Sequence, residues 1–248
     1  GGFIKGTIAK ARLPKTDRDR LATKKVFSAS GGLENLVKAM EETIGRPNIT
    51  LSASGITIRP SENGWQATYK TSEGEQTLHA NTVVTTCGAY ALSALLPFIP
   101  AVDMDKISNL QYAPVVQVSV GIRNTGNLHF NAFGGLVPSC EKKDVLGILF
   151  PAACFDNRAP KGGALFSFFI GGVKRSELTR LTDDELKALV IHEFHAMLKF
   201  PIGIQPDMIR IFRHAHAIPQ YELSSGERFA TIDKLQTRYP GLILAGNI

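Results

Sequence analysis

The chain has 248 residues, of which 44% are hydrophobic and 20% are charged, an ordinary globular composition with enough residues for one or two packed cores. Its formal net charge is +6, but residues 1–25 alone hold eight basic and two acidic side chains, so this segment accounts for the whole excess. Nucleic acid is therefore a poor candidate partner, because the rest of the chain is neutral and no aromatic residues interleave with the basic ones.

The basic segment, residues 1–27, is polar and weakly periodic, which predicts a solvated, mobile loop. Attraction to an anionic membrane surface is the alternative, because each basic residue near such a surface contributes about 1 kcal/mol. The longest apolar run, residues 89–102, contains two prolines and is shorter than the roughly 18 residues that mark a spanning helix. We expect a cytoplasmic protein without a signal peptide, and leave peripheral attachment to the cytoplasmic membrane open.

A helix and several strands are predicted in the first part of the chain. Apolar residues recur at helical spacing over 33–44, with a start signal at Ser30 and end signals at Gly45 and Pro47. Asn63-Gly64 predicts a hairpin turn before a strand in which apolar and polar residues alternate. The expected strands are 49–51, 56–58, 65–70 and 78–86, and a short helix follows at 89–96. The apolar pair in 78–86 is typical of a strand that is covered on both faces.

The second part of the chain predicts another sheet. Apolar residues alternate cleanly from Val116 to Ile122, which indicates a sheet with one buried face. Thr182 and Glu185 form a capping box, which predicts the start of an amphipathic helix over 182–197. Further strands are expected at 146–150, 164–170, 208–213 and 242–245, and a further helix at 229–235. This order predicts a mixed α/β (α+β) fold with a mixed β-sheet, rather than a plain doubly wound sheet.

Motifs for metal or nucleotide chemistry are absent from the sequence. No glycine-rich dinucleotide fingerprint, P-loop or nucleophile elbow occurs, and Cys87, Cys140 and Cys154 are too widely spaced for a zinc site or a disulfide framework. His192 and His195 lie three residues apart, whereas a zinc helix needs a spacing of four. We therefore expect no metal, and we expect these histidines on a solvated helix face. His214 and His216 are likewise expected to be structural or solvated.

Seven segments together resemble the protoporphyrinogen oxidases, flavoenzymes of the amine oxidase superfamily. They follow the family's order and approximate spacing from residue 27 to the last residue. They are FSASGGL (27–33), AFGGLVP (132–138), VLGILF (145–150), FDNRAP (155–160), FFIGG (168–172), IPQY (218–221) and YPGL with AGN (239–247). One such segment would be weak evidence, but seven in order are specific.

The resemblance implies a porphyrin pocket on or beside the predicted strands. A porphyrinogen is a broad apolar macrocycle with acidic side chains at its rim, so its site should be a large apolar slot with few polar groups. A glycine there would let the backbone approach the ligand closely. The positions that match the family's pocket are Phe133, Gly134, Leu136, Leu149 and Phe169. The alternative is that the large residues among them are ordinary core.

The resemblance also implies contacts with FAD. Ile56 matches a strand residue whose backbone meets the adenine end, and the turn that contains Thr86, Cys87 and Gly88 lies near the cofactor in the family. Gly246 and Asn247 match the start of the C-terminal flavin-binding turn. A strand end that leads into a helix is a natural dinucleotide site. Relatives often carry Pro or Ala in place of Cys87, so the alternative for this residue is a small buried hydrophobe.

The implied domain order is a basic arm (1–27), part of an FAD-binding domain (28–106), a substrate-binding domain (107–222) and a return to the FAD-binding domain (223–248). A start at Gly1-Gly2 is not that of a natural gene product, and the family's glycine fingerprint lies upstream of the matched region. We therefore expect a fragment that by itself binds FAD weakly or not at all and does not turn over.

The resemblance implies that the intact protein is an FAD-dependent oxidase that converts protoporphyrinogen IX to protoporphyrin IX in haem biosynthesis, with oxygen as acceptor. No side chain in the chain is a convincing acid or base, so no catalytic residue is predicted. One alternative is another substrate within the superfamily, such as coproporphyrinogen, an amine or a carotenoid. A second alternative is a non-catalytic porphyrin-binding module. The sequence leaves the oligomeric state open.

Overall fold

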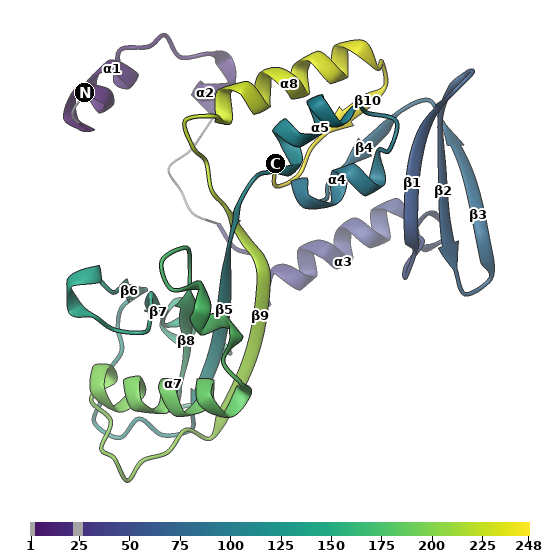
Figure 1. Cartoon of the computed structure of the whole chain (residues 1–248). Coiled ribbons are helices and arrows are strands. Elements are labelled where there is room, and N and C mark those ends of the chain that lie inside the picture. Colours follow the sequence, from purple (N-terminus) through teal and green to yellow (C-terminus); the bar gives the residue numbers. More distant parts are fainter. Residues whose placement is uncertain (1–2, 22–26) are drawn as a thin grey trace. The chain divides into compact units, whose positions relative to one another are not determined.

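The structure, a computed structural model, describes residues 3–21 and 27–248. The chain divides into two compact units, residues 1–49 and 50–248, and each is described by itself (Figure 1). Helices and strands are both abundant in the second unit, so the predicted mixed α/β fold class is confirmed.

The first unit is helical. It contains α1 (Phe3–Ala11), α2 (Asp17–Leu21), α3 (Leu33–Ile44) and the short 3-10 helix η1 (Arg46–Asn48). The prediction of a loop over residues 1–27 is wrong where α1 and α2 form. The sequence of α1 has no proline and is rich in alanine, isoleucine and lysine, which a helix tolerates well. Lys24 and Lys25, which were assigned to the same basic arm, lie outside the described residues.

Helix α3 confirms the predicted periodic segment, but it begins later than the start signal suggested. Gly31 and Gly32 both have positive φ values, so the helical conformation starts only after them, and Ser30 caps nothing. The backbone carbonyl of Ser30 instead accepts a hydrogen bond from the Asn35 amide at 2.8 Å. The predicted end at Gly45 is confirmed, because the Gly45 N–H donates to the Glu41 carbonyl.

The second unit opens with a three-stranded antiparallel sheet, in the order β1-β2-β3. Its strands are β1 (Ser54–Ser61), β2 (Gly64–Thr71) and β3 (Gly74–Ala80). The predicted hairpin is confirmed, because Ser61 pairs with Gly64 across a two-residue turn. The expected strand at 49–51 does not form. The expected strand at 78–86 is in fact the end of β3 and the separate strand β4 (Val83–Thr85), and Val84 is 55% exposed rather than covered on both faces.

A small parallel sheet and three helices complete this part of the unit. Strand β4 pairs in parallel with β10 (Leu242–Leu244). The helices are α4 (Ala89–Leu95), α5 (Ala101–Ser108) and α8 (Ser225–Arg238). Trp65 of β2, Leu92 of α4, Ile107 of α5 and Leu235 of α8 are all buried in one hydrophobic core. This core therefore joins residues from 58–110 with residues from 232–248.

The remaining strands form a five-stranded antiparallel sheet, in the order β6-β7-β8-β5-β9. Its strands are β5 (Tyr112–Ile122), β6 (Gly134–Leu136), β7 (Gly147–Leu149), β8 (Ala164–Gly171) and β9 (Met208–Pro219). Helix α7 (Asp183–Leu198) packs on one face and buries Leu186, Val190 and Phe194 against the sheet (Figure 1). Short helical turns lie at η2 (Ser139–Glu141), α6 (Pro151–Cys154) and η3 (Ser176–Arg180).

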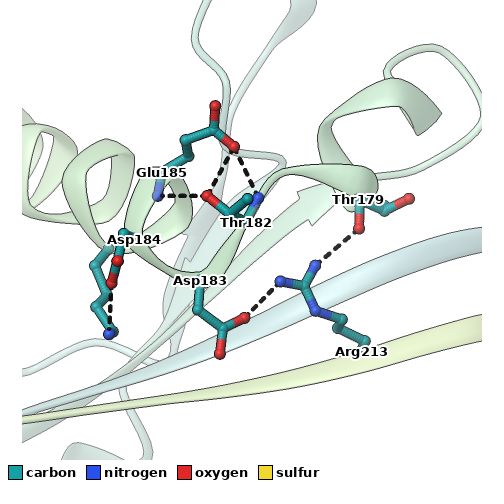
Figure 2. A network of polar contacts seen from close by, with 7 residues as sticks. Thr179, Thr182, Asp183, Asp184, Glu185 and Arg213 are labelled. Atoms are coloured by element: carbon teal, nitrogen blue, oxygen red, sulfur yellow. Dashed lines mark hydrogen bonds and ion pairs between the residues drawn. The ribbon is translucent and has the colours of Figure 1, made fainter.

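The start of α7 is fixed by polar contacts (Figure 2). The Thr182 hydroxyl accepts the Glu185 N–H at 3.3 Å, and the Glu185 carboxylate accepts the Thr182 N–H at 2.8 Å, so the predicted capping box is confirmed. Arg213 of β9 donates to the Thr179 carbonyl and to Asp183. These bonds tie the first turn of α7 to the sheet beneath it.

The predicted assignment of residues to domains stays a prediction, although two separate cores are present.

Candidate functional site

The five-stranded sheet has two chemically different faces. Side chains alternate along each strand, so Val116 and Val118 of β5 and Phe166 and Phe168 of β8 are fully buried toward α7. The residues between them point the other way. We call this second face the distal face, and it carries Leu136, Leu149, Phe169, Gln117, Ser119, Ser167, Arg210 and Phe212.

The strand register brings four of the five predicted porphyrin residues together on the distal face. Leu136 pairs with Gly147, which in turn pairs with Phe169. Gly134 pairs with Leu149, two residues away along β6 and β7. Leu136 is 87% exposed, whereas Leu149 and Phe169 are half-buried. Phe133 lies just before β6 and outside these pairs, where its carbonyl accepts the Phe150 N–H at 3.0 Å.

Gly134 is required by the sheet itself. Its φ is +142°, and a Cβ at this position would collide with the Ile148 carbonyl and lie 2.7 Å from the Leu149 Cα. Strand β7 therefore needs a glycine here for its own close approach, and the expected contact of Gly134 with a ligand stays a prediction.

Polar groups at the centre of the distal face were missed in the sequence. The Gln117 amide donates to the hydroxyls of Ser119 and Ser167, at 3.4 and 3.3 Å, so one strand pair carries a short polar cluster. The cluster is flanked by Phe169 on one side and Phe212 on the other, because both pair with Gln117. The sequence did contain a signal for this cluster, because the residues between the alternating valines of β5 must face away from the core.

The predicted flavin residues after β4 and after β10 meet at a second place. Strands β4 and β10 run in parallel, and their carboxyl ends lead into Thr86-Cys87 and into Gly246, respectively. A Cβ on Gly246, whose φ is +103°, would lie 2.8 Å from the carbonyl oxygens of Thr86 and Cys87. The two turns are therefore in direct contact. Burial raises the pKa of the Cys87 thiol, so this thiol is a neutral, half-buried group.

Tyr112 links the two turns and was not predicted. Its hydroxyl accepts the Ala89 N–H at 2.8 Å and donates to the Asn247 carbonyl, and burial raises its pKa. Tyr90 and His216 stack on each other at 3.8 Å between ring centroids, and Tyr112 lies edge-on to both. Carboxyl ends of adjacent parallel strands are where open α/β sheets bind dinucleotides, so these two turns suit part of an FAD site.

The sequence pattern of the family described as Flavin containing amine oxidoreductase matches residues 2–248. The chain belongs to this family.

The chain is similar to curated protoporphyrinogen oxidases. The chloroplastic protoporphyrinogen oxidases of Nicotiana tabacum and Oryza sativa are 30% and 31% identical over 261 residues, which cover 100% of this chain. The same alignments cover 47% and 48% of those proteins, so the chain spans about half the length of the curated relatives it matches.

Solved structures support the same fold. A crystal structure from Exiguobacterium sp. 255-15, of a protein assigned as a protoporphyrinogen oxidase, gives a TM-score of 0.73 at 20% identity and covers 92% of this chain and 49% of that one. Cyclohexylamine oxidase from Brevibacterium oxydans gives a TM-score of 0.63 at 15% identity, over 87% of this chain and 47% of that one. At these identities the likeness concerns the fold.

Two residues for which the sequence made a prediction, Ile56 and His195, lie apart from both places. Ile56 lies in β1 of the separate three-stranded sheet and is 41% exposed, so its contact with FAD stays a prediction. His195 does not lie on a solvated face: its Nδ1 is 3.0 Å from the Phe200 carbonyl, and its Nε2 is buried. Within residues 3–21 and 27–248, no group of three or more His, Cys, Asp or Glu side chains could hold a metal, and no helix is long and apolar enough to cross a membrane.

Proposed function

We propose that the intact protein is an FAD-dependent oxidase that converts protoporphyrinogen IX to protoporphyrin IX in haem biosynthesis, with oxygen as the electron acceptor. The observation that carries the proposal is the register that gathers Leu136, Leu149 and Phe169 on one face of the sheet. These are the apolar positions at which the family resemblance expects the macrocycle. The names of the relatives that match the whole chain support the same substrate.

The distal face suits a broad apolar ligand. Leu136 and Phe169 offer apolar surface that a broad macrocycle can cover, and the half-buried Leu149 extends this surface by two residues along the strands. The polar groups in the middle hydrogen-bond to one another, so an apolar ring can lie over them at small cost. A site with mostly apolar walls and few polar groups is typical of cofactor-sized ligands.

The contacting turns at the ends of β4 and β10 would hold part of FAD. Thr86, Cys87, Gly88, Gly246 and Asn247 are the candidate contacts, and Tyr112 fixes the two turns relative to each other. Bound FAD would accept hydride from the substrate, while this chain would orient the ring and exclude water. The chain alone, without the remainder of the longer protein, is proposed to be inactive and to bind FAD weakly or not at all.

The test is a porphyrin-fluorescence assay on the intact protein, reconstituted with FAD and given protoporphyrinogen IX under air. We expect fluorescence to grow well above the rate of autoxidation without enzyme. Coproporphyrinogen, in a parallel assay, distinguishes the rival substrate. If FAD is bound and only coproporphyrinogen reacts, the substrate of the proposal is wrong. If neither reacts, the reaction class is wrong, and a porphyrin-binding module becomes the better reading if protoporphyrin IX still binds.

A further inference from the structure

One charged side chain lies on the distal face, at the strand farthest from the predicted porphyrin residues. Arg210 of β9 pairs with Ser119 of β5, which pairs with Ser167 of β8, which pairs with Leu149 of β7. Its neighbours Ile209 and Ile211 pack on the core against α7, so alternation directs Arg210 to the distal face. Arg210 therefore shares one transverse row of the sheet with Leu149.

Arg210 carries the only permanent charge among the distal positions of the five strands. The other residues at these positions are apolar, glycine, serine or glutamine, apart from the titratable His214 and His216. Arg210 is exposed, and its side chain has no hydrogen-bond or ion-pair partner among the residues that the structure describes. A guanidinium at the edge of an apolar face is well placed to bind a carboxylate in a bidentate way.

The neighbouring charged groups are already engaged elsewhere. Asp207 accepts the backbone N–H of Arg123 at 2.7 Å and lies 3.8 Å from its side chain. Arg213, on the opposite face, donates to Asp183 and to the Thr179 carbonyl (Figure 2). The two arginines of β9 thus differ in kind: Arg213 holds the fold together, whereas Arg210 has no structural partner of this type.

The spacing of the row matches a tetrapyrrole. Leu149 and Arg210 are three strand spacings apart, which is about 14 Å, and Phe169 is about 10 Å from the strand of Arg210. A macrocycle that covers Leu149, Phe169 and the serine pair would reach β9 with its rim. The carboxylates of a porphyrinogen lie on that rim, beyond the apolar ring.

We propose that Arg210 binds a rim carboxylate of the substrate and so fixes the orientation of the ring on the distal face. This inference rests on the proposed function for the identity of the ring. It makes Arg210 a specificity-determining residue rather than a catalytic one.

The experiment uses the FAD-reconstituted intact protein and titrates protoporphyrin IX and its dimethyl ester by fluorescence. Arg210→Gln should weaken binding of the diacid about tenfold, Arg210→Lys should weaken it less, and neither should change binding of the diester. Arg180→Gln, which removes an exposed arginine of η3, is the matched control and should change neither ligand. In turnover, Arg210→Gln should raise KM for protoporphyrinogen IX about tenfold while kcat stays within about twofold.

Each of the remaining outcomes contradicts either the inference about Arg210 or the proposed reaction. Equal diacid binding by wild type and Arg210→Gln, loss of FAD rather than porphyrin, or no porphyrin binding at all overturns the inference. Arg210-dependent binding of the diacid without any oxidation of protoporphyrinogen IX upholds the inference and sinks the proposed reaction. Normal turnover and KM in Arg210→Gln upholds the reaction and sinks the inference.

Discussion

Phe168 and Phe169 are adjacent in β8 but face opposite sides of the sheet. Phe168 is fully buried against α7, whereas Phe169 is half-buried on the distal face. Phe169→Ala should therefore raise KM for protoporphyrinogen IX about tenfold, because an aromatic contact contributes about 1.5 kcal/mol. Phe169→Ala should reduce the free energy of unfolding by less than Phe168→Ala does. The measurement is steady-state kinetics of the intact protein together with its thermal midpoint.

Phe168→Ala is the matched control for Phe169→Ala. Removal of a fully buried phenyl ring should reduce the free energy of unfolding by about 3–5 kcal/mol. Phe168→Leu, a milder change, should fold and keep a normal KM. If Phe169→Ala destabilises the protein as strongly as Phe168→Ala does and leaves KM unchanged, then Phe169 is ordinary core and the pocket assignment is wrong.

At the scale of the element, the capping box at the start of α7 makes a contribution to stability that depends on pH. Hydrogen bonds from the Thr182 backbone and hydroxyl lower the pKa of the Glu185 carboxyl. A lowered folded-state pKa means that this contribution to stability is present above the unfolded pKa of Glu185 and is lost as pH falls through the folded pKa. Thr182→Ala should cost about 1 kcal/mol in the free energy of unfolding at neutral pH.

The pH dependence of Glu185→Gln provides the check, because Thr182→Ala keeps the backbone N–H that makes the strongest of these hydrogen bonds to the carboxylate. In chemical denaturation, wild type and Glu185→Gln should differ most near neutral pH and converge as Glu185 becomes protonated. The exposed pair Lys187 and Asp184 lies one turn away, so Lys187→Ala is a suitable control and should change the free energy of unfolding by less than about 0.5 kcal/mol. A difference that stays constant down to acid pH would show that Glu185 takes no part.

The elements that sequence reasoning found are those with strong periodicity. The valine alternation of β5, the stripe of α7 and the turn before Trp65 each determine their structure locally, and all three are confirmed. Helix α5 was missed because it is short and follows Pro100 at its N-cap. Strand β6 was missed because three residues with two glycines carry no pattern, and only their pairing with β7 makes them a strand.

At the scale of the whole molecule, the candidate sites depend on pairings that no local pattern contains. The resemblance supplied Leu136, Leu149 and Phe169 as separate positions, but their common face follows from the order β6-β7-β8. Arg210 could not be found in the same way, because its place opposite Ser119 is a matter of register between strands about 90 residues apart. Tyr112 likewise acts through two turns that are far from it in sequence.

The charge of the chain, unlike its sites, is concentrated in one segment, and this leads to the last prediction. Lys5, Lys10, Arg12 and Lys15 are all exposed beside α1, on which Ile4 and Ile8 are exposed as well. If the basic segment attaches to an anionic membrane surface, changing these four residues to Gln should remove about 4 kcal/mol of binding free energy at low ionic strength.

Sedimentation with vesicles of phosphatidylserine and phosphatidylcholine measures this binding. The control changes four exposed basic residues of the second unit to Gln, namely Arg59, Lys161, Lys174 and Arg180, so that the net charge falls equally. We expect the control to bind like wild type and the binding of wild type to weaken at high salt, because exposed charges are screened over about 8–10 Å. Equal loss in both variants would mean that only the net charge matters, and no binding by wild type would contradict attachment to an anionic membrane surface.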